Sequence, residues 1–457
     1  MALDADRNAT DPVGVTHPEA PLGFWRSYRT ARRNVLELIP RQAFEQPVLT
    51  GGKGRGWIML MEPAALERVL KTNEPNYPKS RVVQRLLSPR RGSNLVIAEG
   101  AEWRWQRRAM SPMFRANAIL ENAQIFSDAA EAAARRLEGA GEAPFDVYPL
   151  MTGATCDVIC DLALSGRDAI DREGLADSVE TFVANIARLS LFDLIGVPNW
   201  VPRPGMLLAR TKVDMDQVTD AMIARRVSEG PRTPPDFVDM LIAAEDPETG
   251  QRLSAVDQRN NLLGFLFAGH ETTALALTWA LYLLALDRAA QEKAAAEARA
   301  VLGGRAAEGR DCASLPYARQ VIEETLRLYP PAGFLTRAAR EADELAGHEV
   351  RAGMTVILPI YALHRHRLLW EAPERFDPGR FAPEEVKARP RYAYLPFGGG
   401  PRICIGLAMA VMEAQIILAT LLDRFEFTLP EGFEPVPRMW FTLRPGTGMP
   451  LIVRPRR

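Results

Sequence analysis

The sequence predicts a mainly α-helical protein with small β-sheets, and three observations support this fold class. Alanine-rich segments with mixed charges, such as "FSDAAEAAARRLEGAG", have strong helix propensity and end at a glycine. Residues typical of strands gather in short runs near 46–61, 345–360 and 427–455. Between the first run and the others, one apolar segment after Ser254 continues far longer than an ordinary helix.

The chain is expected to fold as one domain, residues 1–457. Its 457 residues exceed the usual size of a domain, but no Gly/Ser-rich or charged linker divides them. Hydrophobic residues make up 47% and charged residues 25%, which is enough to build a large core. The polar, proline-containing start lacks the apolar stretch of a signal peptide, so residues 1–20 are expected to form a flexible segment.

Charge and cysteine content argue against two classes of protein. Lys and Arg number 56 and Asp and Glu 57, so the net charge of −1 gives no general attraction for nucleic acid. The four cysteines, Cys156, Cys160, Cys312 and Cys404, are too few and too scattered for a disulfide framework. We therefore expect a monomeric protein of the reducing cytoplasm without a transmembrane anchor.

Turn-forming residues mark a hairpin and two corners. The segment "QPVLTGGKGRGWIMLM" predicts two strands joined by a glycine-rich turn. Proline-rich breaks at Gly196–Gly205 and Gly230–Asp236 lie on either side of a long helical pattern. The first break is a corner that is either fixed or a mobile lid, and the sequence leaves both readings open.

The long apolar segment predicts a helix that crosses the core. Ser254 is a typical N-cap, with Asp257 three residues later, so the helix is expected to begin at about residue 255. No proline follows until far beyond Asp287, and at 1.5 Å per residue the helix would extend roughly 50 Å. Its polar interruption argues for a buried helix rather than a membrane span.

The interruption is the string "AGHETT", residues 268–273. Buried polar groups cost about 1 to 3 kcal/mol each when unsatisfied, so a polar ligand is expected to face them. Gly269 would allow a flat ligand to approach, and the Thr272 hydroxyl can donate to the Ala268 carbonyl and open a polar groove. Alternatively, the cluster only fixes packing register, and His270 is a packed side chain rather than a metal ligand.

The string "FGGGPRICIG", residues 397–406, places Cys404 just before an apolar helix. A helix N-terminus favours thiolate over thiol, and the thiolate is the form that binds metals. The three glycines can direct backbone amides at the sulfur, Phe397 can shield it, and Arg402 can neutralise a nearby anion. We therefore expect a loop that holds a thiolate.

This string matches the pattern Phe-x-x-Gly-x-Arg-x-Cys-x-Gly at every specified position, and the chain resembles the cytochrome P450 family, the haem-thiolate monooxygenases. Matches to the family extend from about residue 50 to the end. The resemblance implies that Cys404 is the metal ligand, the axial ligand of the iron of haem b. It also implies that the long central helix lies over the haem, and that Phe397, Gly398, Gly406 and Ala268 lie beside this cofactor.

Other family motifs assign two further groups. In "AGHETT", Glu271 and Thr272 correspond to the catalytic acid and alcohol that relay protons to oxygen. In "EETLRLYPP", Glu324 and Arg327 resemble the family's buried Glu-x-x-Arg pair, which a second arginine completes as a structural support. Both "PERF" and "PGRF" offer that arginine, and counting from Trp370 and Cys404 favours Arg380.

The segment "GAEWRWQRRAMSPMF" resembles the family's Trp-x-x-x-Arg helix, which would direct Trp103 and Arg107 at the haem propionates. Arg337 and Arg402 fall at the positions of further propionate partners, and guanidinium groups suit carboxylates because both can pair in two places. Arg104 and Arg108 fit either a solvated basic face or a docking site for an electron donor.

The resemblance implies an enzyme that inserts one oxygen atom from O2 into an apolar organic substrate. Electrons would come from NAD(P)H through a separate ferredoxin or flavoprotein, because the sequence has no dinucleotide or flavin fingerprint. Two alternatives are a peroxygenase that uses peroxide directly and a non-catalytic haem-binding sensor or carrier. By family position, apolar residues form the expected substrate pocket: residues 82–96 and 182–192, Ala268, Phe334, Leu335 and Phe441.

Overall fold

The computed structural model describes residues 11–456 except 53, 55, 88–91, 140, 142 and 164–214. The pocket wall expected at 182–192 and the corner at Gly196–Gly205 lie outside these residues. The α-helices are α1 (Phe24–Arg33), α2 (Pro63–Glu67), α3 (Arg81–Leu87), α4 (Gly100–Met110), α5 (Ala116–Glu121), α6 (Gln124–Glu138), α7 (Val147–Ala163), α11 (Met215–Glu229), α12 (Phe237–Ala243), α13 (Ala255–Leu286), α14 (Arg288–Leu302), α15 (Pro316–Leu328), α16 (Ile360–Leu363), α17 (Pro383–Ala388) and α18 (Leu407–Arg424).

Short 3-10 or π turns join these helices, and the strands are short. The turns are η1 (Val35–Leu38), η2 (Arg41–Phe44), η3 (Arg68–Thr72), η4 (Glu74–Asn76), η5 (Ser111–Phe114), η6 (Gly309–Ser314), η7 (Pro378–Phe381) and η8 (Gly400–Arg402). The strands are β1 (Val48–Gly51), β2 (Trp57–Leu60), β3 (Phe145–Asp146), β4 (Leu335–Ala338), β5 (Asp343–Leu345), β6 (His348–Val350), β7 (Thr355–Leu358), β8 (Phe425–Thr428), β9 (Pro437–Met439), β10 (Leu443–Pro445) and β11 (Pro450–Pro455). A mainly helical fold with small sheets is confirmed.

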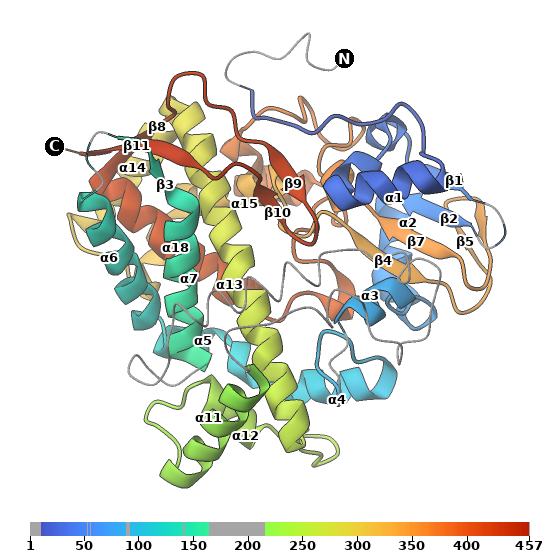
Figure 1. Ribbon diagram of the computed structural model, residues 1–457, viewed down its shortest axis with the longest axis horizontal. Helices are drawn as coiled ribbons and strands as arrows, with labels where there is room; N and C mark the ends of the chain where they lie inside the picture. Colours follow the sequence, from blue (N-terminus) through green and yellow to red (C-terminus); the bar gives the residue numbers. More distant parts are fainter. Residues whose placement is uncertain are drawn as a thin grey trace.

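The strands form four small sheets. The largest has the order β1-β2-β7-β4, and the predicted hairpin forms its edge, with Val48 opposite Leu60 and Gly51 opposite Trp57. The others pair β3-β11-β8, β9 with β10 and β5 with β6. In Figure 1, the four-stranded sheet lies on one side of α13, and α6, α7 and α18 lie on the other.

Helix α13 begins and runs as the sequence predicts. The Ser254 side chain accepts from the Asp257 amide, and the helix continues for 32 residues to Leu286. Most of its side chains from Ala274 to Leu284 are buried, so it forms the centre of the core. In the part of the chain that is described, no single helix is long and apolar enough to cross a bilayer. α13 and α14 reach that length and apolar character only together, and they are bent by 115° relative to each other.

One expectation for this helix is wrong. Gly269 was expected to leave room for a flat ligand, but a Cβ built on it would lie 3.1 Å from Cδ1 of Ile159 in α7. The missing side chain therefore lets two helices approach closely. The Thr155 hydroxyl of α7 adds a hydrogen bond of 2.7 Å to the His270 carbonyl.

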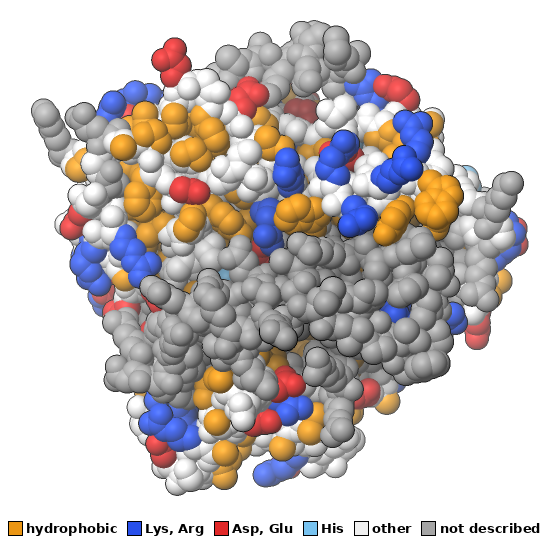
Figure 2. Space-filling model, in the orientation of Figure 1, with side chains coloured by type: hydrophobic (Ala, Val, Ile, Leu, Met, Phe, Trp, Pro, Cys, Tyr) orange, Lys and Arg blue, Asp and Glu red, His pale blue; other side chains and the backbone are white. Residues whose placement is uncertain are grey.

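The alanine-rich helices are solvated on one face only. α14 ends at Gly303 in the left-handed conformation, with φ of 58°, as its glycine stop predicts. Its inner face buries small side chains, Ala290, Ala294, Ala295 and Ala298. The surface seen in Figure 2 mixes basic, acidic and apolar side chains, which is consistent with the net charge near zero.

Candidate active site

The cysteine turn is a tight loop that ends just before α18. The Cys404 amide donates to the Phe397 carbonyl at 2.9 Å and closes the turn. Gly398 and Gly400 have φ of 71° and 67°, which glycine adopts without strain. A Cβ on Gly398 would lie 3.6 Å from Cδ1 of Leu335, so strand β4 borders the turn.

The Cys404 side chain is exposed, although the apolar helix α18 follows it. Neighbouring protein atoms nevertheless displace much of the water around the sulfur, and this desolvation raises the pKa of the Cys404 thiol. The Gly406 amide and the positive charge of Arg107 act in the opposite direction and lower that pKa. The helix terminus alone therefore does not produce the expected thiolate, which requires a bound cation.

One face of α13 is partly exposed. Gly264, Ala268 and Thr272 are spaced by four residues and therefore share a helix face. Ala268 is exposed, and a Cβ on Gly264 would have no other atom within 4 Å. The Thr272 hydroxyl donates to the Ala268 carbonyl at 2.7 Å in an exposed hydrogen bond, and Thr272 is half-buried. The sequence predicts this bond.

Phe114 joins α13 to the cysteine turn. Its ring lies 5.4 Å from that of Phe265 in α13, and Cε1 of Phe114 lies 3.9 Å from a Cβ built on Gly406. The middle of α13 and the loop of Cys404 thus contact the same aromatic ring. Phe114 therefore lies between α13 and the segment that directly follows Cys404.

Glu271, the acid of the expected acid and alcohol pair, forms an ion pair with a residue of strand β10. Its side chain is 8% exposed and forms an ion pair with Arg444 of β10, whose side chain is 14% exposed. The neighbouring His270 ring is buried, and within the described part of the chain neither ring nitrogen has a hydrogen-bond partner. No motif connects positions 271 and 444, so sequence reasoning missed Arg444.

Arg402 lies in a buried group of charges. It forms ion pairs with Glu74 and Glu99 at 2.5 Å each, and its guanidinium carbon lies 4.5 Å from the centre of the Trp103 ring. Glu99 also lies 3.7 Å from the amino group of Lys79. The structure thus brings Trp103 and Arg402 together, with Glu74, Glu99 and Lys79 as additional members.

This group has more cations than anions, because Arg337 joins Arg402 and Lys79 beside Glu74 and Glu99. Arg337 is 7% exposed, and burial, reinforced by the Arg402 charge, lowers its pKa to about 10. Burial lowers the pKa of Lys79 to about 8, with a further contribution from Arg402. Glu99 raises both values but does not restore them. A ligand with two carboxylates, such as the propionates of haem, would fit here and relieve the cations.

The Glu324 and Arg327 side chains are fully buried and form a two-point ion pair of 2.6 and 2.7 Å. Arg380 lies 3.6 Å from the same carboxylate, whereas Arg375 contributes its backbone carbonyl to Arg327 at 2.9 Å. Arg327 also donates to the carbonyls of His364 and Pro373. The network ties α15 to the segment before the cysteine turn.

The expected substrate residues lie at different depths. Leu335 borders the cysteine turn, and Phe334 is partly buried against the core. Phe441 is 39% exposed at the tip of the β9–β10 hairpin. Figure 1 shows this hairpin beside α13.

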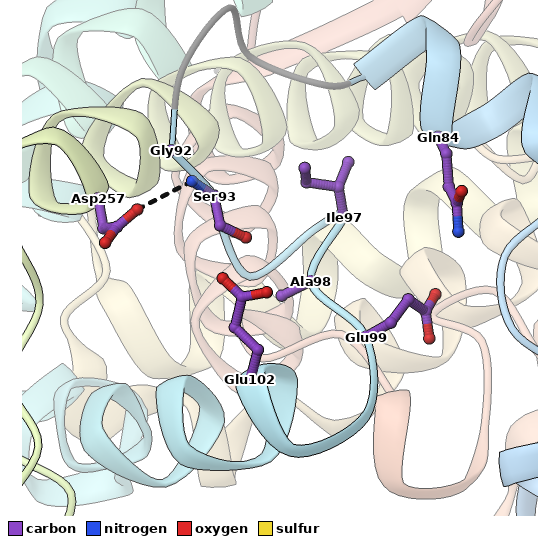
Figure 3. A pocket seen from close by; sticks show the side chains of 8 residues that line it. All are labelled: Gln84, Gly92, Ser93, Ile97, Ala98, Glu99, Glu102 and Asp257. Atoms are coloured by element: carbon purple, nitrogen blue, oxygen red, sulfur yellow. Dashed lines mark hydrogen bonds between the residues drawn. The ribbon is translucent and has the colours of Figure 1, made fainter. Parts of the chain in front are cut away.

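A polar cavity of about 550 Å³ opens on the side of Glu99. Figure 3 shows that its lining comes from α3, the segment before α4, α4 itself and the start of α13, with Gln84, Gly92, Ser93, Ile97, Ala98, Glu99, Glu102 and Asp257. Cys404, Glu271 and Thr272 are not among these residues. The cavity touches the charged group around Arg402 but is not where the reactive side chains meet.

Comparison with known proteins agrees with this geometry. The family model described as cytochrome P450 matches residues 41–450. Cyclooctatin synthase of Streptomyces melanosporofaciens is 32% identical over 399 residues, which are 86% of this chain and 85% of that protein. Human cytochrome P450 4V2 is 32% identical over 387 residues, or 78% of this chain and 72% of that protein.

A solved structure, the haem domain of cytochrome P450DA, superposes with a TM-score of 0.78 at 26% identity and covers 90% of each chain. On the family match over most of its length, and on relatives more than 30% identical, the chain belongs to the cytochrome P450 family, an enzyme family of haem-thiolate monooxygenases.

Proposed function

We propose that this chain binds haem b through Cys404 and inserts one oxygen atom from O2 into an apolar organic substrate. The observation that supports the proposal is Cys404, an exposed residue in a glycine turn that shares the Phe114 ring with α13, the helix that bears the Thr272 hydroxyl. Bound haem would supply the oxygen chemistry: substrate R–H, O2, two electrons and two protons give R–OH and water.

The residues around the turn hold the cofactor. Cys404 is the iron ligand, and the Gly406 amide donates toward its sulfur and tunes its electron density. Phe397 and Gly398 shape the turn, and Ala268 leaves room on the opposite helix. Trp103, Arg107, Arg337 and Arg402 hold the propionates, and we add Lys79 to this set because its cation is buried in the same group.

Proton delivery is the task of Thr272 and Glu271. The single proton of the Thr272 hydroxyl is donated to the Ala268 carbonyl at rest, and rotation of the hydroxyl away from that carbonyl would let it donate toward bound oxygen. Glu271 then restores that proton from solvent. A peroxide-using enzyme or a carrier needs no such pair, so the pair supports the O2-dependent reaction.

An apolar substrate follows from Leu335 beside the turn and from the aromatic rings of Phe334 and Phe441. We assign electron supply to a separate ferredoxin or flavoprotein in the cytoplasm, because the sequence has no flavin or dinucleotide fingerprint. Glu324, Arg327 and Arg380 support the turn and take no part in the reaction.

The deciding experiment is an optical titration of the purified ferric protein with fatty acids, terpenoids, steroids and small aromatics. A saturable shift of the Soret band would identify the substrate class, and product formation with added reductase and ferredoxin would establish the reaction. Cys404→Ser should lose the Soret signature of thiolate ligation, whereas Cys312→Ser should keep it. A Cys404→Ser protein that keeps that signature would contradict the proposal.

A further inference from the structure

The β9–β10 hairpin is fixed to the middle of α13 by two consecutive residues. Nε1 of Trp279 donates to the Leu443 carbonyl at 3.1 Å, and Leu443 donates to the Pro331 carbonyl at 3.0 Å. The next residue, Arg444, reaches Glu271, two turns nearer the start of the helix. The hairpin is therefore bound to α13 at two points, by a hydrogen bond at Trp279 and by an ion pair at Glu271.

The contact between Arg444 and Glu271 lies in a poorly solvated place. Both side chains are less than one-sixth exposed, at 14% and 8%, so their attraction is stronger than at an open surface. Nε of Arg444 has no hydrogen-bond partner among the described residues, and its guanidinium carbon lies 5.8 Å from the Trp440 ring. Arg444 is thus directed at Glu271 rather than spread over several acceptors.

A positive charge elsewhere in the hairpin also makes a nearby anion favourable for Arg444. Arg438 lies directly opposite it in the ladder, and like charges in that position repel. Glu271 offsets this repulsion from the helix side. Removing the carboxylate would leave two arginines facing each other, so hairpin and acid stabilise one another.

The hairpin also carries the residue expected to touch the substrate. Phe441 at its tip is 39% exposed, three positions before Arg444. Thr272, which follows Glu271, lies on the partly exposed face of α13. A carboxylate held by Arg444 is therefore held toward the hairpin, and its readiness to serve Thr272 depends on that contact.

We propose that Arg444 is a positioning residue for proton delivery: it holds the Glu271 carboxylate on the β9–β10 hairpin and sets the orientation from which the acid serves Thr272. This inference rests on the proposed function. It assigns a role to a residue of β10, outside both the cysteine turn and α13, and it links proton supply to the strand pair that bears Phe441.

The test compares Arg444→Gln, which removes the charge, with Arg444→Lys, which keeps it, in the haem-loaded protein. Arg438→Gln is the matched control, because it removes a charge from the paired position without touching Glu271. Substrate binding is measured by the Soret shift, coupling by product formed per NAD(P)H, and proton transfer by the solvent deuterium isotope effect and the pH profile.

Arg444→Gln should lower coupling on the order of tenfold and change the isotope effect, with substrate affinity nearly unchanged. Its pH profile should differ from that of the wild type, because the positive neighbour of the Glu271 carboxylate is gone. Arg444→Lys should restore most of the coupling and bring the isotope effect and the pH profile back toward those of the wild type. An unchanged pH profile and isotope effect, or the same changes in Arg438→Gln, would overturn the proposal.

A double variant separates this inference from the proposed function. Glu271→Gln combined with Arg444→Gln should be no worse coupled than Glu271→Gln alone, since the arginine acts through the acid. If the protein shows no turnover, the proposed function fails. The melting temperatures of the wild type, the two single variants and the double variant, each loaded with haem, still test the ion pair between Glu271 and Arg444. Additive losses in that cycle would overturn the role of Arg444, and non-additive losses would support it.

Discussion

Gly400 of the cysteine turn lies so close to Leu70 that a Cβ added to Gly400 would stand 1.9 Å from the Leu70 carbonyl oxygen. This is overlap with backbone, which cannot rotate away as a flexible side chain can. The same glycine has φ of 67°, a conformation that side chains rarely adopt. Two independent requirements thus select glycine four residues before Cys404.

Gly400→Ala is therefore expected to displace the cysteine turn and to lose most of the bound haem. Gly432→Ala is the matched control, because Gly432 has a similar φ of 71° but nothing within 4 Å of its missing Cβ. That control should cost only about 1 kcal/mol, from backbone conformation alone. Haem content and melting temperature measure both, and equal losses would show that contact with Leu70 is not the cause.

The buried Glu324–Arg327 pair should be among the costliest to break. Glu324→Gln leaves the Arg327 charge without its counter-ion in a place with no solvent, which costs about 3 to 5 kcal/mol. Its neighbour Glu323 provides the comparison, because it pairs with Arg319, whose side chain is 57% exposed. Glu323→Gln should cost less than about 1 kcal/mol in urea unfolding. Similar losses for the two variants would mean that burial does not set the cost.

How far the sequence predicts this site depends on how far apart the partners lie. The Ser254 cap and the Thr272 bond to Ala268 join residues three or four apart, and local rules predict both. The partners of Arg402 lie 328 and 303 positions away, and only the folded chain brings them together. Glu271 and Arg444 are separated by 173 positions in the same way.

The error at Gly269 has a different origin. A glycine in a helix signals close approach, but the pattern does not state what approaches, and here it is Ile159 of α7. The choice of Arg380 over Arg375 shows the opposite case, because spacing from Trp370 and Cys404 selected the arginine whose side chain lies near Glu324. Sequence spacing identifies a contacting residue where a family motif fixes the register of the loop. Where no motif does so, as at Gly269, spacing does not identify the neighbour.

Lowering the pH should reduce the stability of the fold, partly because His270 takes up a proton on unfolding. Burial lowers the pKa of this imidazole from 6.5 to about 4, so the unfolded chain binds more protons between those values. Stability contributed by the neutral ring is present above pH 6.5 and is lost as the pH falls, up to about 3 kcal/mol. His270→Gln cannot take up that proton and should lose less stability between pH 6.5 and 4. His348→Gln, at an exposed position, should follow the wild type in thermal unfolding across this range.

Thr272 and Thr278 make the same local bond, each donating to the carbonyl four residues earlier at 2.7 Å, but they stand in different places. Thr278 is fully buried, whereas Thr272 is half-buried on the face of α13 that bears the exposed Ala268. Thr278→Ala should therefore cost about 1 to 2 kcal/mol of stability and leave coupling normal.

Thr272→Ala should do the reverse, because the lost group delivers protons rather than filling the core. Product formed per NAD(P)H is expected to fall by about tenfold or more while peroxide release rises and the substrate-induced Soret shift persists. Melting temperature should change little. Coupling that survives in Thr272→Ala, together with efficient turnover on added peroxide, would instead identify a peroxygenase, since that reaction brings its protons and both oxygen atoms with the peroxide.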